Sequence, residues 1–338
     1  MTGPDFEIFE GCREKPAIVF IHGLGMDKRI WVSPHEARIL AGQFPIHILL
    51  CKKRPALRQK AQDEQRGSKS PLRQIVIGTP ECKLQTVFHD LRKEGYTLIA
   101  YSQKRPASPL DIAILELKVV LESTINHSPS GFILIGHSRG GLIGRRYLHH
   151  YKDNRIKALI TISTPHKGTR MATLVKYISP FASFIKPLIP ESERGTILYL
   201  FKRISEFLSA PAVKELLPDS DIIKSLDDNV VDGVKYLSIG GSSPSLLCFN
   251  RITEVNEGKG EKFKMEKILS FPDAVERLIP RRFLPREIRK GEGDGLVSVE
   301  SSRMPEAEHY TFSLNHAEIL FSKRVRERLV HKIKEFTG

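Results

Sequence analysis

The sequence feature that most constrains the fold is an unbroken apolar run at residues 132–135 that leads directly into a serine flanked by glycines. A short run without polar residues is typical of a strand buried on both faces of a parallel sheet. Gly-His-Ser-Arg-Gly follows at 136–140, and residues 141–151 have apolar side chains at helical spacing. The sequence therefore predicts a strand, a tight turn carrying Ser138 and a helix in immediate succession.

The two glycines of this motif have a steric reason. In so tight a turn, side chains at Gly136 and Gly140 would collide where the strand meets the helix, and the backbone of Ser138 is expected to be strained. Such strain exposes the serine hydroxyl. A Gly-x-Ser-x-Gly pattern also occurs by chance in ordinary turns, but the strand before it and the helix after it favour a nucleophile.

Strands and helices alternate along much of the chain. Alternation predicts right-handed crossovers and a mostly parallel sheet flanked by helices, with functional loops at the carboxyl ends of the strands. A length of 338 residues allows one large core, so residues 1–338 are expected to form a single α/β domain. The other expected strands are 17–21, 45–51, 74–77, 97–101, 158–163, 235–239 and 309–314, and the other expected helices are 31–42, 84–94, 110–125 and 322–336.

The alternation stops at residues 167–231, where no convincing strand is found. Two stretches there carry apolar residues at helical intervals, which predicts a helical cap inserted into the domain. The two stripes consist of Met171, Leu174, Val175, Ile178, Ala182 and Ile185, and of Ile197, Leu200, Phe201, Ile204, Phe207 and Leu208.

A serine hydroxyl needs a neighbouring base to take its proton, and in this kind of fold the acid and the histidine follow the serine in that order. Asp294 lies in a glycine-rich loop, Gly-Glu-Gly-Asp-Gly-Leu-Val, beyond the strand at 235–239, and His316 lies just past the last strand. Asp294 would hold the imidazole of His316 in the correct tautomer, and His316 would transfer the proton from Ser138.

Other histidines and acids compete for these roles. His309 lies in or before a strand and His331 on the terminal helix, where packing or solvated histidines are ordinary, so His316 is favoured as the base. The alternatives for the acid are Asp219, Asp221, Asp227 and Asp228 near the end of the cap, and Glu292 close to Asp294.

Two backbone amides are expected to stabilise the developing oxyanion. One is the amide of Arg139, directly after the nucleophile, and the other is the amide of Leu24, in the His-Gly-Leu-Gly loop after the first apolar strand. The glycines of that loop allow the backbone to approach a substrate. His22, at its start, is interpreted as a hydrogen-bonded structural residue.

Together these motifs resemble the α/β-hydrolase lipases, especially bacterial triacylglycerol lipases and their inositol-deacylase-like relatives, over nearly the whole chain. The resemblance implies ester hydrolysis through an acyl-enzyme intermediate, without a cofactor, by a triad of Ser138, Asp294 and His316. It implies an oxyanion hole at Leu24 and Arg139. The motifs that carry it are Phe20-Ile21-His22-Gly23, Gly136 to Gly141, Ser163 to Thr169, Gly293 to Val297 and Asn315-His316, and the expected pocket residues are His22, His137, Thr164, Pro165 and His166.

The sequence departs from that pattern at Arg139, where such lipases more often carry methionine or glutamine. Its side chain either lies near the acyl pocket or is held in a salt bridge. Acyl thioesters and phospholipids remain alternative substrates, because pocket shape alone decides between them. The apolar stripes of the cap are equally compatible with ordinary core packing and with an acyl tunnel beneath a movable lid.

The formal net charge of +14 allows a rival function in binding membrane surfaces or nucleic acid on a hydrolase scaffold. The densest basic cluster, at residues 52–73, lacks interleaved aromatic residues that could stack on bases, so a mobile solvated loop is expected there and nucleic acid is not. Contact is therefore expected with an ester or lipid substrate and, transiently, with a lipid surface.

The four cysteines form no Cys-x-x-Cys pair, so a metal site is not expected, and reduced, partly buried thiols are predicted. The chain shows neither a secretory leader at its start nor a membrane-spanning apolar stretch, which leads to the expectation of a cytoplasmic protein.

Overall fold

A seven-stranded sheet forms the centre of the protein, with strand order β1-β6-β2-β7-β8-β9-β12. All neighbouring strands are parallel except the edge strand β1, which is antiparallel to β6. The computed structural model describes residues 5–40, 42–51, 74–79, 83–105, 107–188, 191–226, 230–256 and 261–338. The strands are β1 (Asp5–Phe9), β2 (Ala17–Ile21), β6 (Leu98–Ser102), β7 (Phe132–His137), β8 (Ile156–Ile162), β9 (Lys235–Gly241) and β12 (Glu308–Phe312).

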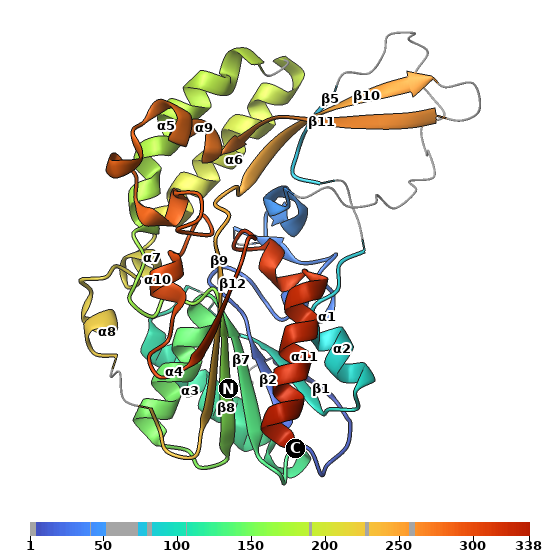
Figure 1. The fold of residues 1–338 in the computed structure, drawn as a ribbon, viewed down its shortest axis with the longest axis vertical. Helices are drawn as coiled ribbons and strands as arrows, with labels where there is room; N and C mark the ends of the chain where they lie inside the picture. Colours follow the sequence, from blue (N-terminus) through green and yellow to red (C-terminus); the bar gives the residue numbers. More distant parts are fainter. Residues whose placement is uncertain are drawn as a thin grey trace.

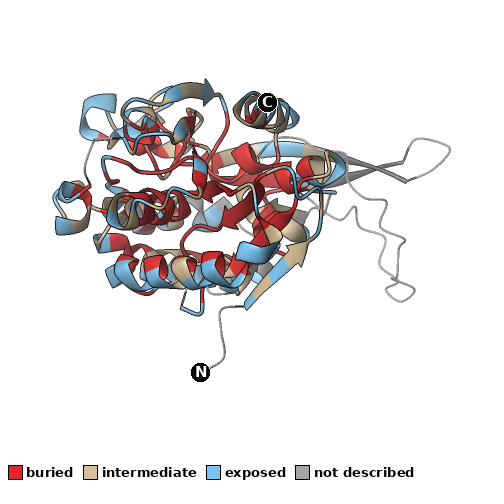
Figure 2. Cartoon of the chain, turned by 90° about the horizontal axis from the view of Figure 1, so that it is seen from below, coloured by how far each residue is buried: buried red, intermediate tan, exposed pale blue. Residues whose placement is uncertain are grey.

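Helices cover both faces of this sheet (Figures 1 and 2). Side chains of β2 alternate between the faces, so Val19 enters one apolar cluster with α3 and α4, and Phe20 enters a second cluster with α1, α2 and α11. Burial on both faces explains why the inner strands are continuous apolar runs. The helices are α1 (Arg29–Val32), α2 (Val87–Lys93), α3 (Leu110–Ser123), α4 (Arg139–Tyr151) and α11 (Lys323–Thr337).

The mostly parallel sheet flanked by helices confirms the predicted fold class. Two local predictions are wrong. The apolar residues at 45–51 form the short 3-10 helix η1 (Ile46–Leu49), because periodicity cannot distinguish so short a run from a buried helical turn. The helix expected at 31–42 ends at Val32, because Pro34 disfavours helical geometry at the residue before it.

Between β8 and β9 the chain forms helices, in the region where a cap was expected. The helices at Met171–Leu174 (η3) and Val175–Ile185 (α5) contain the first apolar stripe, and Glu191–Leu208 (α6) contains the second. Figure 1 places α5 and α6 together above the sheet. The remaining helices of the region are η4 (Lys186–Leu188), α7 (Pro211–Lys214) and α8 (Asp221–Lys224).

A three-stranded antiparallel sheet, β11-β10-β5, lies beside this helical region and projects from the body of the protein (Figure 1). The strand β5 (Gln74–Ile77) was predicted, whereas β10 (Leu247–Asn256) and β11 (Glu261–Phe271) were not. Charged residues interrupt the apolar pattern of both unpredicted strands, so hydrophobic periodicity gives a weak signal there. The edge strand β1 was missed as well.

The remaining short elements connect these layers. The chain between β9 and β12 includes helical turns on either side of the glycine-rich loop that carries Asp294. They are α9 (Asp273–Leu278), η5 (Arg281–Phe283), η6 (Arg286–Ile288) and α10 (Val299–Ser302), and elsewhere the chain forms β3 (Arg38–Ile39), β4 (Phe44–Pro45), η2 (Ile125–His127) and η7 (Glu318–Leu320).

Cys51 and Cys248 form a disulfide, which corrects the prediction of reduced thiols. The two residues are 197 positions apart, and their proximity arises only because β10 packs beside η1. Cys12 is a free thiol and is exposed instead of partly buried. Cys82 and the basic segment at 52–73 lie outside the described residues.

Within the described ranges, no helix combines the length and apolar character needed to cross a membrane.

Reduction of the Cys51–Cys248 bond is expected to lower the free energy of unfolding by about 2–4 kcal/mol, because the bond closes a long loop in the unfolded chain. The measurement compares unfolding midpoints with and without dithiothreitol in a Cys12→Ser background. Cys12→Ser alone should leave the midpoint unchanged. Equal midpoints in the oxidised and reduced samples would contradict the prediction.

Candidate active site

Ser138 occupies a strained turn between β7 and α4. Its backbone has φ 54° and ψ −127°, a conformation that non-glycine residues rarely adopt. A Cβ atom at Gly136 would lie 2.4 Å from the amide nitrogen of Gly141, and one at Gly140 would lie 2.4 Å from the carbonyl oxygen of Ile21. Both glycines are therefore sterically required, and the predicted strain at Ser138 is present.

His316 and Asp294 form a buried hydrogen-bonded pair. The Nδ1 atom of His316 lies 2.9 Å from Oδ2 of Asp294, with the side chains only 4% and 1% exposed. The other carboxylate oxygen accepts hydrogen bonds from the amides of Leu296 and Val297. These contacts fix the orientation of the carboxylate, and the carboxylate in turn orients the imidazole so that Nε2 is the nitrogen left for chemistry.

Asn315 positions the loop that carries His316, a role that sequence analysis did not assign. Its side-chain amide donates to the carbonyl oxygens of Leu49 and Ser245, and its side-chain oxygen accepts from the amides of Ala317 and Glu318. A fully buried asparagine with every polar atom paired holds a loop in one conformation. The sequence feature that could have indicated this role is the position of Asn315 next to His316.

A second histidine, His137, lies behind His316. The two rings are 4.8 Å apart, and Nε2 of His137 donates to the backbone carbonyl oxygen of His316 at 3.0 Å. Burial and the neighbouring His316 hold the pKa of His137 well below its usual range. His137 is thus a neutral donor that supports the backbone of His316.

His22 is a structural residue in the loop after β2, as interpreted from the sequence. Its Nδ1 donates to the carbonyl oxygen of Gly23 at 2.9 Å, and its Nε2 accepts from the amide of Gln103 at 3.0 Å. The loop passes close to the nucleophile, because a Cβ atom at Gly23 would lie 3.1 Å from Cβ of Ser138. The next residue, Leu24, is therefore near Ser138 as well.

The side chain of Arg139 points away from this site. It is buried, and its guanidinium donates to the carbonyl oxygen of Ser108 and to Oε1 of Gln103. Desolvation lowers its pKa. Its backbone amide is the first of α4, where amide groups face outward from the helix end. Of the two interpretations of this side chain, the structure does not support a place in the acyl pocket, and the hydrogen bonds to Gln103 and Ser108 go to an amide and a carbonyl oxygen instead of a carboxylate.

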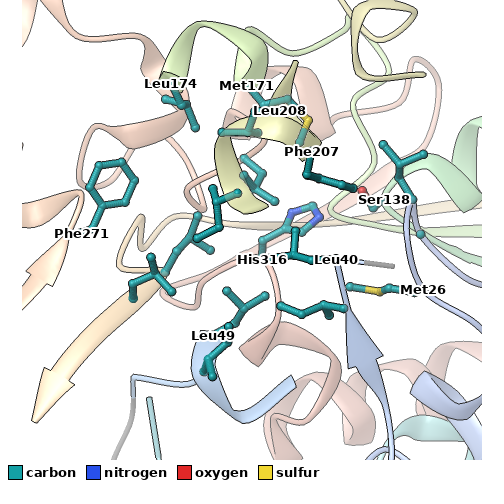
Figure 3. A pocket seen from close by; sticks show the side chains of 18 of the residues that line it. Met26, Leu40, Leu49, Ser138, Met171, Leu174, Phe207, Leu208, Phe271 and His316 are labelled. Carbon is teal, nitrogen blue, oxygen red and sulfur yellow. The ribbon is translucent and has the colours of Figure 1, made fainter. Parts of the chain in front are cut away.

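Ser138 and His316 both line a cavity of about 110 Å³ (Figure 3). The remaining lining is apolar or glycine. The helical region contributes Met171, Leu174, Ile178, Ile204, Phe207, Leu208 and Leu216; the segments after β2 contribute Gly23, Leu24, Met26, Ile39, Leu40, Ile48 and Leu49; and later segments contribute Leu246, Leu247, Phe271 and Leu296.

This lining differs from the predicted pocket. His22, His137, Thr164, Pro165 and His166 are all buried but do not line the cavity. Thr164 packs against Gly141, and His166 bonds to Oγ1 of Thr161, so this turn supports α4 and β8 instead of a pocket wall. Six of the lining residues belong to the two apolar stripes that the sequence indicates, namely Met171, Leu174, Ile178, Ile204, Phe207 and Leu208. The other apolar lining residues were missed because they lie in loops, in short elements or at strand ends, where no helical period marks them.

The competing candidates lie outside the cavity. His309 bonds to Ser238 and Thr311, His331 pairs with Glu335 on the surface of α11, and Glu292 pairs with Arg281. Asp219 and Asp221 are also absent from its lining, and Asp227 and Asp228 are outside the described residues. Among the described residues, no group of three or more histidine, cysteine, aspartate or glutamate side chains is placed to hold a metal.

The parallel sheet, its two helical layers and the serine turn define an α/β-hydrolase fold. The chain is similar to the mature lipase BlEst2 of Bacillus licheniformis, with 15% identity, a TM-score of 0.56 and 100% of both chains covered. The propeptide form of that lipase gives 15% identity and a TM-score of 0.55, with 100% of this chain and 54% of the other covered. At this identity, the similarity establishes the fold.

The model of the palmitoyl protein thioesterase family matches residues 110–201, less than half of the chain. The matched range includes Ser138 but neither Asp294 nor His316. No curated protein has a matching sequence.

Burial lowers the pKa of His22 from 6.5 to about 4, which makes folding stability depend on pH. The unfolded chain takes up this proton as the pH falls below about 6.5, whereas the folded protein resists protonation until about pH 4. His22 therefore contributes stability above pH 6.5 that is lost as the pH falls toward 4, by about 3 kcal/mol in total.

The variant His22→Asn has no such proton to bind. We expect the free energy of unfolding of His22→Asn to lie furthest below that of the parent protein at pH 7. At pH 4 the difference should be about 3 kcal/mol smaller, as measured by urea unfolding. His331→Asn, on the surface of α11, is the matched control for the exchange of a histidine for asparagine and is measured at the same two pH values. A deficit for His22→Asn that is constant with pH would contradict the assignment.

Proposed function

We propose that the protein is a serine hydrolase that cleaves carboxylic esters through an acyl-enzyme intermediate. The observation that carries the proposal is the cavity itself, because Ser138 and His316 are the only polar side chains among the described residues that line it. An apolar chamber with one hydroxyl and one imidazole suits an acyl chain whose carbonyl carbon lies at the hydroxyl.

In the proposed mechanism, His316 Nε2 takes the proton of Ser138 as Oγ attacks the ester carbonyl carbon. Asp294 stabilises the resulting imidazolium through the hydrogen bond at Nδ1. The tetrahedral oxyanion accepts hydrogen bonds from the amides of Leu24 and Arg139 and is favoured by the N-terminus of α4. The imidazolium then protonates the leaving alcohol, and the acyl group stays on Ser138. In the second half of the reaction, His316 takes a proton from water as the water attacks the acyl carbonyl carbon. The imidazolium then returns a proton to Ser138 as the carboxylic acid leaves.

The cavity volume supports a preference for short acyl chains. At about 110 Å³ the cavity is smaller than the roughly 150 Å³ apolar cavity that accommodates benzene, so an acyl chain of about four to six carbons fills it. Some residues of the two apolar stripes line the cavity, and others, such as Phe201, lie in the core without lining it. We propose that the lining members contact the acyl chain. Longer chains require those helices to shift.

Thioester hydrolysis is the second candidate. The palmitoyl protein thioesterase match over residues 110–201 favours it, and the same groups would attack a thioester carbonyl. We further propose an oxidising compartment in place of the expected cytoplasm, because a disulfide such as Cys51–Cys248 persists where thiols are not kept reduced.

The proposed triad is tested by hydrolysis of para-nitrophenyl esters with acyl chains from two to sixteen carbons. Ser138→Ala and His316→Ala are each expected to lower kcat by about 10⁴-fold or more, because nucleophile and base act as a unit, and Asp294→Asn should also lose most activity. His331→Ala and Glu292→Gln are matched controls for base and acid and should retain activity. A parent protein inert on oxygen esters but active on acyl thioesters would favour the second candidate.

The distal end of the cavity should set the acyl length. Figure 3 places Leu174 and Phe271 at the end away from Ser138. Phe271→Ala is expected to shift the maximum of kcat/KM toward longer acyl chains by about two to four carbons, because it removes a ring from the cavity wall. Phe201→Ala is the control, because it removes a ring of the same aromatic cluster but Phe201 does not line the cavity. The chain-length profile of this variant should stay unchanged. Identical shifts in both variants would refute the proposed acyl site.

A further inference from the structure

A second hollow, of about 680 Å³, lies on the other side of the wall that bounds the acyl cavity. Met171 and Leu174 line the acyl cavity, whereas Arg170 and Thr173, one residue before each of them, line this cleft. Residues 170–174 therefore lie between the two hollows, and different side chains of this segment line each of them. Charged side chains make up much of the described lining of the cleft, together with Tyr177 and Phe283.

The side chains around the cleft are strongly basic. Among the described residues of its lining, six are cationic, Lys167, Arg170, Lys176, Arg282, Arg286 and Arg289, and two are carboxylates, Glu287 and Glu300. Such an excess of like charge around one concave surface raises the local potential and attracts anions.

The carboxylates compensate only part of this charge. Glu300 is shared between Lys167 and Arg286. Glu287 is buried, and its carboxylate accepts from the amide of Arg170 and from Oγ1 of Thr169. Both acids are thus engaged within the protein.

Three cations stay available to a ligand. In the described part of the chain, Arg170, Lys176 and Arg282 make no ion pair with a carboxylate, and all three are exposed. Arg289 differs, because it pairs with Glu292 and donates to the carbonyl oxygen of Leu284.

An exposed aromatic ring adjoins these cations. Phe283 is 62% exposed, Arg282 lies 4.8 Å from its ring centroid, and Tyr177 donates to its carbonyl oxygen. An exposed phenylalanine in a basic cleft offers a stacking surface for a planar ring.

We propose that this cleft binds a nucleotide, with its phosphate groups on Arg170, Lys176 and Arg282 and its base against Phe283. The volume lies within the range of roughly 300–1,000 Å³ typical of small-molecule sites. Arginine matches phosphate oxygens with two parallel hydrogen bonds, and lysine supplies a point charge. A concave site of this size favours a small phosphorylated molecule over a flat lipid surface.

The test is equilibrium binding of ADP and of inorganic pyrophosphate to the full chain at low salt, by calorimetry. ADP is expected to bind, and to bind more tightly than pyrophosphate because of the ring contact. Lys176→Ala/Arg282→Ala should weaken ADP binding by at least about tenfold, since each charge-assisted contact to phosphate contributes roughly that factor or more. Phe283→Ala should lower ADP affinity to the level of pyrophosphate.

Lys202→Ala/Lys224→Ala is the control, because it removes the same charge from α6 and α8 outside the cleft, and it should bind ADP as the parent does. Thermal unfolding midpoints verify that all variants fold. The proposal is overturned if ADP does not bind, if the control weakens binding as much as the cleft variant, or if the protein binds phosphatidate vesicles but not ADP.

Discussion

The close crossing of β7 and α4 is the constraint on which the rest of the site depends. Gly136 lies against the amide of Gly141, and Gly140 lies against the carbonyl oxygen of Ile21, so neither position has room for a side chain. The crossing forces Ser138 into a positive φ and brings the end of β2 to the start of α4. The crossing therefore also places the loop after β2 beside the nucleophile.

Burial limits which side chains around the candidate site carry a charge. Desolvation lowers the pKa of His22 and of His137 and keeps both rings neutral, and Arg139 turns its guanidinium toward Gln103 and Ser108. The carboxylate of Asp294 is thus the charged group that His316 meets at hydrogen-bond distance. Because both side chains of this pair are buried, the carboxylate acts on the imidazole with little screening by water.

The sequence predicts the central sheet and the three residues of the candidate site because their signals are local. Apolar runs identify buried strands, and a residue just after a parallel strand must lie at one edge of the sheet. The part of the cavity lining outside the two helical stripes could not be predicted in the same way. Leu49 and Phe271 are far apart along the chain, and they meet only through packing of η1 and the hairpin β10-β11. The partnership of Cys51 with Cys248 has the same origin.

That disulfide divides the polypeptide into a covalent ring and two open arms. Residues 51–248, with Ser138 and the helices above the sheet, belong to the ring, whereas Asp294 and His316 belong to the carboxyl-terminal arm. A single backbone cleavage within the ring leaves both fragments joined, while one cleavage between Cys248 and Asp294 releases the acid and base from covalent connection with the nucleophile. One cleavage within the ring therefore leaves the oxidised protein covalently joined, whereas the same cleavage divides the reduced protein into two separate chains.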